Sequence, residues 1–249
     1  MARGKIVCFY GGKGGVGKTT TLLSLAGTLS KLNKKVLIVD LDLTNGAIAI
    51  SLNREANKTI FNFVKDYINN KYNDLDKYIT KYDENISFVA CPKDPRYASR
   101  IDVKYIDILL EKSVYNYDVV LIDTPSILNE ISVYSLDKSD IVYLLTTNDC
   151  VSLKNIKNLV NLFIENNLDK YKIILNNSFI PNKDYFSNYD IKNIIGHNVD
   201  YVISSSFHVN NLDELVVNGE LITYKYSKFK DEKIFNLIAS EIIGGNIDE

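Results

Sequence analysis

Nine consecutive residues near the start of the chain, Gly-Lys-Gly-Gly-Val-Gly-Lys-Thr-Thr at positions 12–20, have the composition of a phosphate-binding loop. Gly12, Gly17, Lys18 and Thr19 satisfy the pattern G-x-x-x-x-G-K-[ST]. Glycines let the backbone turn its N–H groups around a pyrophosphate, and the helix that follows points its positive end at the same anion. We expect Lys18 to reach the β- and γ-phosphates and the Thr19 hydroxyl to bind Mg²⁺. The loop therefore predicts a site for a nucleotide and its magnesium ion.

The segments on either side of the loop are those that such a site requires. The apolar run Lys5–Tyr10 predicts a strand before it, and Thr20–Leu32 predicts a helix after it. A glycine-rich turn that merely joins a strand to a helix is the alternative, and this flanking pattern disfavours it. The residues expected to bind the nucleotide in the loop are Gly12, Gly14, Gly15, Val16, Gly17, Lys18, Thr19 and Thr20.

Acidic residues follow two other apolar runs. Asp40 and Asp42 come at the end of Val36–Val39, and we expect both carboxylates to point into the crevice where α/β sheets bind ligands. Asp123 follows Val119–Ile122, as the acid of a Walker B element does, close to Mg²⁺ and the γ-phosphate. Helix-capping or solvated acids are the alternative for the first pair.

Asn176 ends a later apolar run, Lys172–Leu175. Its amide both donates and accepts hydrogen bonds, so it could pair with the edge of an adenine base. A strand-terminal asparagine is also a common turn former, and the residues alone leave both interpretations open.

These residues need a scaffold that brings strand ends together, and the order of segments indicates one. Short Val/Ile/Leu runs without period-2 alternation suit strands of a parallel sheet that is buried on both faces. The expected strands are Ile6–Tyr10, Val36–Val39, Ser87–Ala90, Val119–Ile122, Ile141–Thr146, Lys172–Leu175 and Tyr201–Ser204. The expected helices are Thr20–Leu32, Ile60–Asn69, Val103–Lys112, Ser132–Asp137, Ser152–Asn166, Phe186–Ile195 and Asp231–Ile243. This alternation predicts a single α/β domain over residues 1–249, a doubly wound, mostly parallel sheet with helices on both faces.

The composition and charge of the chain indicate its cell compartment and the partners that it is not built to attract. Hydrophobic residues make up 46% of 249 residues, and a net charge of −2 creates no global field toward nucleic acid or membranes. Cys8, Cys91 and Cys150 lack metal-ligand spacing, which indicates ordinary buried thiols in a reducing cytosol. The chain opens without a signal-peptide pattern, and no apolar stretch approaches the roughly 18 residues that span a bilayer. We therefore expect a cytoplasmic protein without a transmembrane segment.

Taken together, these motifs resemble the ParA/MinD family, the deviant Walker A or SIMIBI-class P-loop ATPases, from Lys5 to about Ile243. The most specific element is Lys13, which ordinary phosphate-binding loops do not require. In this family the equivalent lysine crosses an ATP-dependent dimer to the partner's nucleotide. The resemblance implies a bacterial ATPase that binds ATP and Mg²⁺, forms a homodimer with ATP, and uses Lys13 to neutralise phosphate charge. Without the resemblance, Lys13 would be interpreted as a solvated loop cation.

The resemblance also implies individual roles. Asp42 is expected to position the attacking water, which makes the catalytic set Lys13, Lys18 and Asp42. Asp40 and Asp123 would support Mg²⁺ with Thr19, and Asn176 would contact adenine. The chain departs from the family pattern at three places. Asn177 stands where an arginine or lysine is usual, and Thr147-Asn148-Asp149-Cys150 lacks a proline that is common there. Ser204-Ser205 also stands where a proline is usual.

Three kinds of partner surface distinguish members of this family. Partition members bind nonspecific DNA, and cell-division and flagellar-placement members insert a C-terminal amphipathic helix into the membrane. Pilus and secretion members are polar-localisation factors, so a placement ATPase would be recruited by a protein or by a membrane. The last predicted helix carries an apolar stripe but also Asp231, Glu232 and Glu241, which favours core packing over a membrane anchor. The stripe consists of Ile234, Phe235, Leu237, Ile238, Ile242 and Ile243.

One basic cluster could contact DNA phosphates. Its lysines are Lys225, Lys228, Lys230 and Lys233, interleaved with Tyr224, Tyr226 and Phe229. A solvated loop before the last helix is the alternative interpretation.

Two further functional classes stay open at this stage. Bacterial tyrosine kinases share the phosphate loop and the Asp-x-Asp strand, but they lack the Lys13 signature and carry a tyrosine-rich tail, whereas no tyrosine follows Tyr226 here. A nucleotide-gated binding switch that scarcely hydrolyses ATP is the other class, whereas the resemblance implies an ATP hydrolase that is slow and stimulated by a partner.

Overall fold

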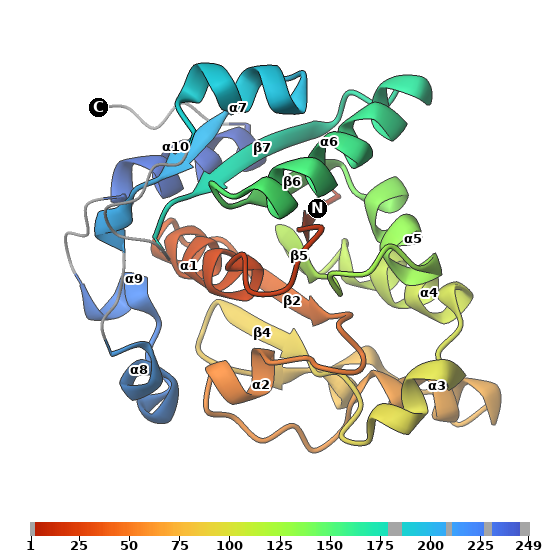
Figure 1. Cartoon of the computed structure of the whole chain (residues 1–249). Helices are drawn as coiled ribbons and strands as arrows, with labels where there is room; N and C mark the ends of the chain where they lie inside the picture. Colours follow the sequence, from red (N-terminus) through yellow and green to blue (C-terminus); the bar gives the residue numbers. More distant parts are fainter. Residues whose placement is uncertain (1–2, 179–185, 208–210, 227–230, 245–249) are drawn as a thin grey trace.

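Short apolar segments assemble into one eight-stranded sheet in the computed structural model, which describes residues 3–178, 186–207, 211–226 and 231–244 (Figure 1). The order across the sheet is β3-β4-β2-β5-β1-β6-β7-β8, and every neighbouring pair is parallel except β3 with β4. The strands are β1 (Lys5–Tyr10), β2 (Val36–Asp40), β3 (Thr80–Lys81), β4 (Ile86–Val89), β5 (Val119–Asp123), β6 (Ile141–Thr146), β7 (Tyr171–Asn176) and β8 (Tyr201–Ile203).

Helices connect the strands in the alternating manner that the sequence predicts. The longer helices are α1 (Lys18–Lys31), α3 (Ile60–Ile68), α4 (Val103–Ser113), α5 (Glu130–Lys138), α6 (Cys150–Glu165), α7 (Asn188–Ile195) and α10 (Glu232–Ile243). The shorter ones are α2 (Ile48–Ser51), α8 (Leu212–Asn218), α9 (Ile222–Lys225) and the 3₁₀ helices η1 (Leu75–Tyr78), η2 (Pro95–Arg100) and η3 (Ser205–Phe207). The predicted fold class, a doubly wound and mostly parallel sheet, is confirmed.

Both faces of the sheet are buried because its strands carry apolar side chains on both sides. One face packs against α1, α2, α8, α9 and α10 through a core that includes Phe9, Ile38 and Tyr143. The other face packs against α3 and α4 at one end and α5, α6 and α7 at the other. In Figure 1, α8 and α9 lie at the left beside α1, with α3 and α4 at the right. The continuous hydrophobic strand runs follow from this double coverage.

Three helices begin at other residues than the sequence predicts, because the residues before them cap or end the preceding loop. Gly17 adopts a left-handed conformation with φ 90° and ends the loop, so α1 begins at Lys18 and not at Thr20. The Asn129 side chain accepts from the Ser132 backbone N–H, so α5 begins earlier than the predicted Ser132. Ser187 accepts from the Asp190 backbone N–H, so α7 begins at Asn188 and not at Phe186.

The last helix, α10, packs into the core. Phe235, Ile238, Ala239 and Ile242 are buried, and of the predicted stripe only Leu237 is strongly exposed, at 53%. This confirms the interpretation of α10 as a core helix. No helix in the described ranges has both the length and the apolar character needed to cross a bilayer.

Candidate nucleotide-binding site

The carboxyl edge of the sheet gathers the predicted site residues. The phosphate loop joins β1 to α1, and β1 is paired with β5, which ends at Asp123. β2 lies on the other side of β5, with Asp40 opposite Asp123 in the parallel register. Parallel strands therefore bring together polar residues that are far apart in sequence, at the edge where such sheets bind ligands.

The loop has the backbone geometry of an anion site. Gly15 and Gly17 have φ values of 78° and 90°, a region in which residues with a Cβ are strained. Gly17 then precedes α1, so the positive end of this helix faces the loop. Beyond the loop lies an open cavity of about 480 Å³. Its described lining consists of Gly14, Gly15, Gly17, Lys18, Thr19, Thr20, Asp42, Thr44, Asn45, Pro125, Ser126 and Ile127.

Lys18 and Thr19 are held by polar partners within this cavity. The Lys18 Nζ donates to Ser126 Oγ at 2.7 Å, and the Thr19 hydroxyl donates to Asp123 Oδ2 at 2.7 Å. Burial lowers the pKa of the Lys18 ammonium, while the nearby charges of Asp123 and Asp42 oppose that shift. Sequence reasoning missed Ser126, which carries no motif of its own and follows Asp123-Thr124-Pro125.

Asp123 is a buried carboxylate with one oxygen atom that could bind a metal ion. Its side chain is buried, and burial raises its pKa to about 6, although the Thr19 hydroxyl and the Lys18 charge lower it. Among the described residues, its Oδ1 atom has no hydrogen-bond partner. A buried carboxylate oxygen beside a hydroxyl is a donor set that suits Mg²⁺, so Thr19 and Asp123 fit this ion. The described residues contain no group of three His, Cys, Asp or Glu side chains arranged around a metal.

Asp40 and Asp42 lie in different surroundings. Asp42 is half-buried, lines the cavity, and accepts from the Asn45 backbone N–H at 3.2 Å. Asp40 is buried, and its Oδ2 atom accepts from the Ile48 backbone N–H at the start of α2. A Cβ on Gly46 would lie 2.5 Å from both Asp40 Oδ2 and Cys91 Sγ, so this carboxyl packs against Gly46 and Cys91. Burial and the Asp123 charge raise the pKa of Asp40 well above its ordinary value.

Lys13 lies at the surface of the loop and is paired within its own chain. Its Nζ atom is 3.2 Å from Asp149 Oδ2, and the two side chains are 43% and 24% exposed. Asp149 caps α6, because it accepts from the backbone N–H groups of Val151 and Ser152. Burial raises the pKa of Asp149, but hydrogen bonds from Thr147, Ser152 and Lys13 outweigh this and hold it below its ordinary value. The 147–150 segment, a departure from the family pattern, thus supplies the partner of Lys13.

Asn176 makes three side-chain hydrogen bonds to protein atoms. Its Nδ2 atom donates to the Val16 carbonyl at 2.9 Å, and its Oδ1 atom accepts from the backbone and hydroxyl of Ser178. These bonds hold the side chain against the loop, and its contact with adenine stays a prediction. Sequence reasoning missed a second asparagine, Asn155 of α6, whose Nδ2 atom donates to the Gly12 carbonyl at 2.6 Å.

The remaining predictions concern surfaces around the site. The departure at Ser204 is tied to α10, because its backbone N–H and hydroxyl both donate to the Asp231 carboxylate. Lys225 of the basic cluster pairs with Glu220 at 2.8 Å, and Lys233 is exposed. Lys228, Phe229 and Lys230 lie outside the described residues. Of the three cysteines predicted to be buried, Cys8 is buried, but Cys91 is half-buried and Cys150, the first residue of α6, is exposed.

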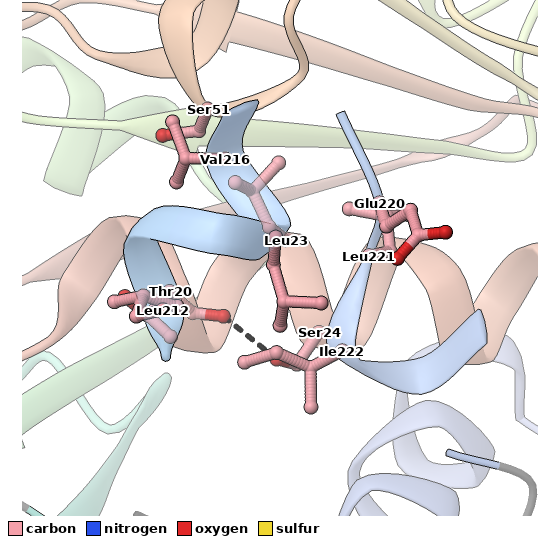
Figure 2. A pocket seen from close by; sticks show the side chains of 10 residues that line it. Thr20, Leu23, Ser24, Ser51, Leu212, Val216, Glu220, Leu221 and Ile222 are labelled. Atoms are coloured by element: carbon pink, nitrogen blue, oxygen red, sulfur yellow. Dashed lines mark hydrogen bonds between the residues drawn. The ribbon is translucent and has the colours of Figure 1, made fainter. Parts of the chain in front are cut away.

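A second, smaller pocket of about 50 Å³ lies behind the loop between α1 and the α8–α9 segment (Figure 2). Figure 2 shows Leu23 and Ser24 of α1 among the lining side chains, with the Ser24 hydroxyl donating to the Thr20 carbonyl. Thr20 lines both this pocket and the larger cavity. The small pocket is mainly apolar and lacks the glycine N–H groups of the loop, so phosphate chemistry belongs to the larger cavity.

Comparisons with known proteins agree with this geometry. A family model described as an AAA domain matches residues 4–179. A putative septum site-determining protein MinD from Emiliania huxleyi is 24% identical over 196 residues, which cover 77% of this chain and 71% of that protein. MinD from Helicobacter pylori is 28% identical over 158 residues, and these cover 63% of this chain and 58% of that relative. The chain thus matches less than two thirds of the length of the Helicobacter relative.

Solved structures extend the likeness over more of the chain. A ParA family ATPase from Chlorobium tepidum superposes with a TM-score of 0.82 at 19% identity, covering 94% of this chain and 98% of that one. MinD complexed with Mg-ADP from Pyrococcus horikoshii has a TM-score of 0.78 at 21% identity, covering 96% and 95%. At these identities the structures establish the shared fold. With the matching family model, they show that this chain belongs to the ParA/MinD family of P-loop ATPases.

Proposed function

We propose that this protein is a Mg²⁺-dependent ATPase that forms a homodimer when it binds ATP and acts as a switch in DNA partition or intracellular positioning. The observation that carries the proposal is Lys13, a half-exposed loop cation next in sequence to Gly14, which lines the cavity together with Lys18 and Thr19. An exposed ammonium at this place could pair with a phosphate of the nucleotide that the other chain of the dimer binds. Hydrolysis would reopen the dimer and release the partner or surface that it holds.

The residues of the cavity divide the chemistry among them. Lys18 balances charge on the β- and γ-phosphates, and it would exchange its Ser126 partner for a phosphate oxygen. Asp42 faces the cavity and orients the attacking water for in-line displacement. Thr19 and Asp123 would hold Mg²⁺, with Asp40 supporting that region, and the ion would supply charge neutralisation of the phosphates.

Lys13 has to leave Asp149 before it can serve a second chain. The Lys13–Asp149 pair is partly exposed, and ion pairs of this kind contribute only about 0–1 kcal/mol. Triphosphate oxygens of a partner's nucleotide, in a site from which water is excluded, would compete well for the same ammonium. The proposed dimer therefore has to break only a weak ion pair to recruit Lys13.

Two variants test this proposal directly. Lys13→Ala should still bind nucleotide but stay monomeric with Mg-ATP, and its hydrolysis should fall about 100-fold because a charge that stabilises the transition state is lost. Asp42→Ala should form the ATP-bound dimer and fail to hydrolyse ATP. Light scattering after size exclusion and steady-state phosphate release measure both properties.

The control is Lys154→Ala, which removes an exposed lysine of α6 and should behave as the wild type. Full turnover by Lys13→Ala would rule out its role in the partner's site. A monomeric Asp42→Ala in ATP would contradict the assignment of Asp42 to water positioning.

The surface held by the dimer is either nonspecific DNA or a recruiting protein, and the packing of α10 supports these over a membrane. Sedimentation with duplex DNA, with and without ATP, separates the two. ATP-dependent co-sedimentation that weakens steeply with salt would indicate partition through the basic cluster. A chain that stays in the supernatant would favour the alternative, a placement ATPase recruited by a protein.

A further inference from the structure

A loop that binds phosphate through N–H groups must turn its carbonyl oxygens elsewhere, because an oxygen facing the anion would repel it. Carbonyls turned into the protein need donors, since an unpaired buried carbonyl costs free energy. Two loop carbonyls have such donors here. Asn176 of β7 holds the Val16 carbonyl, and Asn155 of α6 holds the Gly12 carbonyl.

The Asn155 contact accounts for the first glycine of the motif. A Cβ on Gly12 would lie 2.7 Å from the Asn155 Cβ atom, closer than side chains approach one another. Gly12 has no positive φ, unlike Gly15 and Gly17. The close approach of α6, and not backbone conformation, therefore explains why this position needs glycine.

Holding this carbonyl also sets the direction of an N–H group. The described residues contain no cis peptide bond, and in a planar trans peptide the C=O and N–H groups point in opposite directions. When Asn155 draws the Gly12 carbonyl toward α6, the Lys13 N–H must point away from α6. By the same geometry, Asn176 directs the Gly17 N–H away from β7.

We propose that Asn155 is a positioning residue of the nucleotide site, which fixes the Gly12–Lys13 peptide so that the Lys13 N–H serves the phosphates. The same helix holds the Lys13 side chain through Asp149, so α6 controls both the backbone and the side chain of this residue. This inference rests on the proposed function, because it assumes that the loop binds nucleotide.

The test compares isosteric changes at two asparagines of α6. Asn155→Asp keeps the shape but loses the donor and places a carboxylate oxygen against the Gly12 carbonyl, whereas Asn155→Ala only removes the donor. Asn158 is exposed on the same helix, so Asn158→Asp and Asn158→Ala carry the same changes without this contact. Calorimetric titration with Mg-ADP and Mg-ATP gives the dissociation constants, and thermal melting of the nucleotide-free proteins checks folding.

We expect Asn155→Asp to weaken nucleotide binding about tenfold or more, with Asn155→Ala in between, and the Asn158 variants to stay within about twofold of the wild type. Because the loop contact is made alike in ground and transition states, the KM for ATP should rise while kcat stays within about twofold. A merely structural role would lower the melting temperature and leave the dissociation constants of the folded variants unchanged.

A folded Asn155→Asp that binds both nucleotides as tightly as the wild type would overturn this inference and leave the proposed function standing. A wild-type chain that binds neither Mg-ADP nor Mg-ATP would overturn the proposed function, and the inference with it.

Discussion

Burial, and not an ion pair, dominates the electrostatic environment of the Asp123 carboxyl. Its side chain is 2% exposed, its Oδ2 atom accepts from Thr19, and its pKa is raised to about 6 from 3.8 chiefly by desolvation. A group whose pKa is higher in the folded state stabilises the fold through its proton. That stability is complete below the unfolded pKa and is lost as the pH rises through about 6.

The free energy of unfolding of the nucleotide-free protein should therefore fall between about pH 4 and pH 6 because of this one carboxyl. Asp123→Asn removes the charge and should be more stable than the wild type by about 1–3 kcal/mol at pH 7–8, with little difference near pH 4. Urea unfolding across this pH range, without Mg²⁺, measures both curves.

Asp169→Asn is the control, because Asp169 is exposed and its loss should leave the pH profile of the wild type unchanged. If the difference between Asp123→Asn and the wild type did not change with pH, the raised pKa of Asp123 would be refuted.

At this scale, the sequence predicts residues whose chemistry has a fixed local pattern. Gly12, Lys18 and Thr19 belong to a contiguous motif, so their approximate places followed from the chain alone. Ser126 and Asn155 reach the loop only through the packing of β5 and α6 beside β1, and no local spacing marks such contacts. The burial that raises the pKa of Asp123 is likewise a property of the assembled sheet.

Among the elements, α1 shows how closely the short C-terminal helices pack. A Cβ built on Gly27 of α1 would overlap the hydroxyl of Thr223 in α9, and it would lie 3.2 Å from a methyl group of Leu221. The Thr223 hydroxyl is buried, and within the described chain it has no hydrogen-bond partner. Gly27 therefore serves close helix packing at a position where alanine would favour the isolated helix.

Gly27→Ala tests this packing. Alanine favours an exposed helix by about 0.5–1 kcal/mol, but overpacking a buried contact costs about 1–3 kcal/mol, so we expect net destabilisation. Adding Thr223→Ala removes the overlapping hydroxyl and should recover most of the loss. Urea unfolding of both single variants and the double variant gives the coupling energy.

A strictly additive cycle, in which Thr223→Ala fails to rescue Gly27→Ala, would mean that the Gly27 contact does not limit the approach of α9 to α1.

Element length explains which helices the sequence predicted. The seven predicted helices are all present, whereas α2, α8 and α9, with four, seven and four residues, were missed because they are too short for a 3.6-residue period to appear. Strand β3 has two residues and pairs antiparallel with β4 at the sheet edge, so it also lacks a pattern. These short elements take their form from the surfaces that they cover.

For the molecule as a whole, α10 completes the core and is tied to the sheet by polar contacts. Glu241 accepts hydrogen bonds from the Tyr143 and Tyr201 hydroxyls at 3.2 and 2.7 Å. Its carboxylate also lies 3.7 Å from the Lys172 Nζ atom. Glu241 therefore faces the sheet and anchors α10 there. Together with the buried apolar residues of this helix, that contact explains why its apolar stripe does not require a membrane.

Adjacent residues of α10 separate core packing from a membrane role. Ile238 is fully buried, so Ile238→Asp should destabilise the protein by more than about 4 kcal/mol, because an unpaired charge enters the core. Leu237 is 53% exposed, so Leu237→Asp should change the free energy of unfolding by no more than about 0.5 kcal/mol. Denaturant unfolding measures both changes, and Leu237→Asn controls for the added charge.

The same Leu237→Asp variant then reports on membranes. If α10 stays packed in the ATP-bound protein, wild type and variant should both remain in the supernatant when mixed with anionic liposomes and Mg-ATP. If α10 instead detaches on ATP binding and enters the bilayer, the wild type should sediment. Leu237→Asp should then sediment much less, because it places a carboxylate among anionic headgroups. If the wild type sediments only with ATP and Leu237→Asp abolishes this sedimentation, then α10 has two states, one packed in the core and one bound to the membrane.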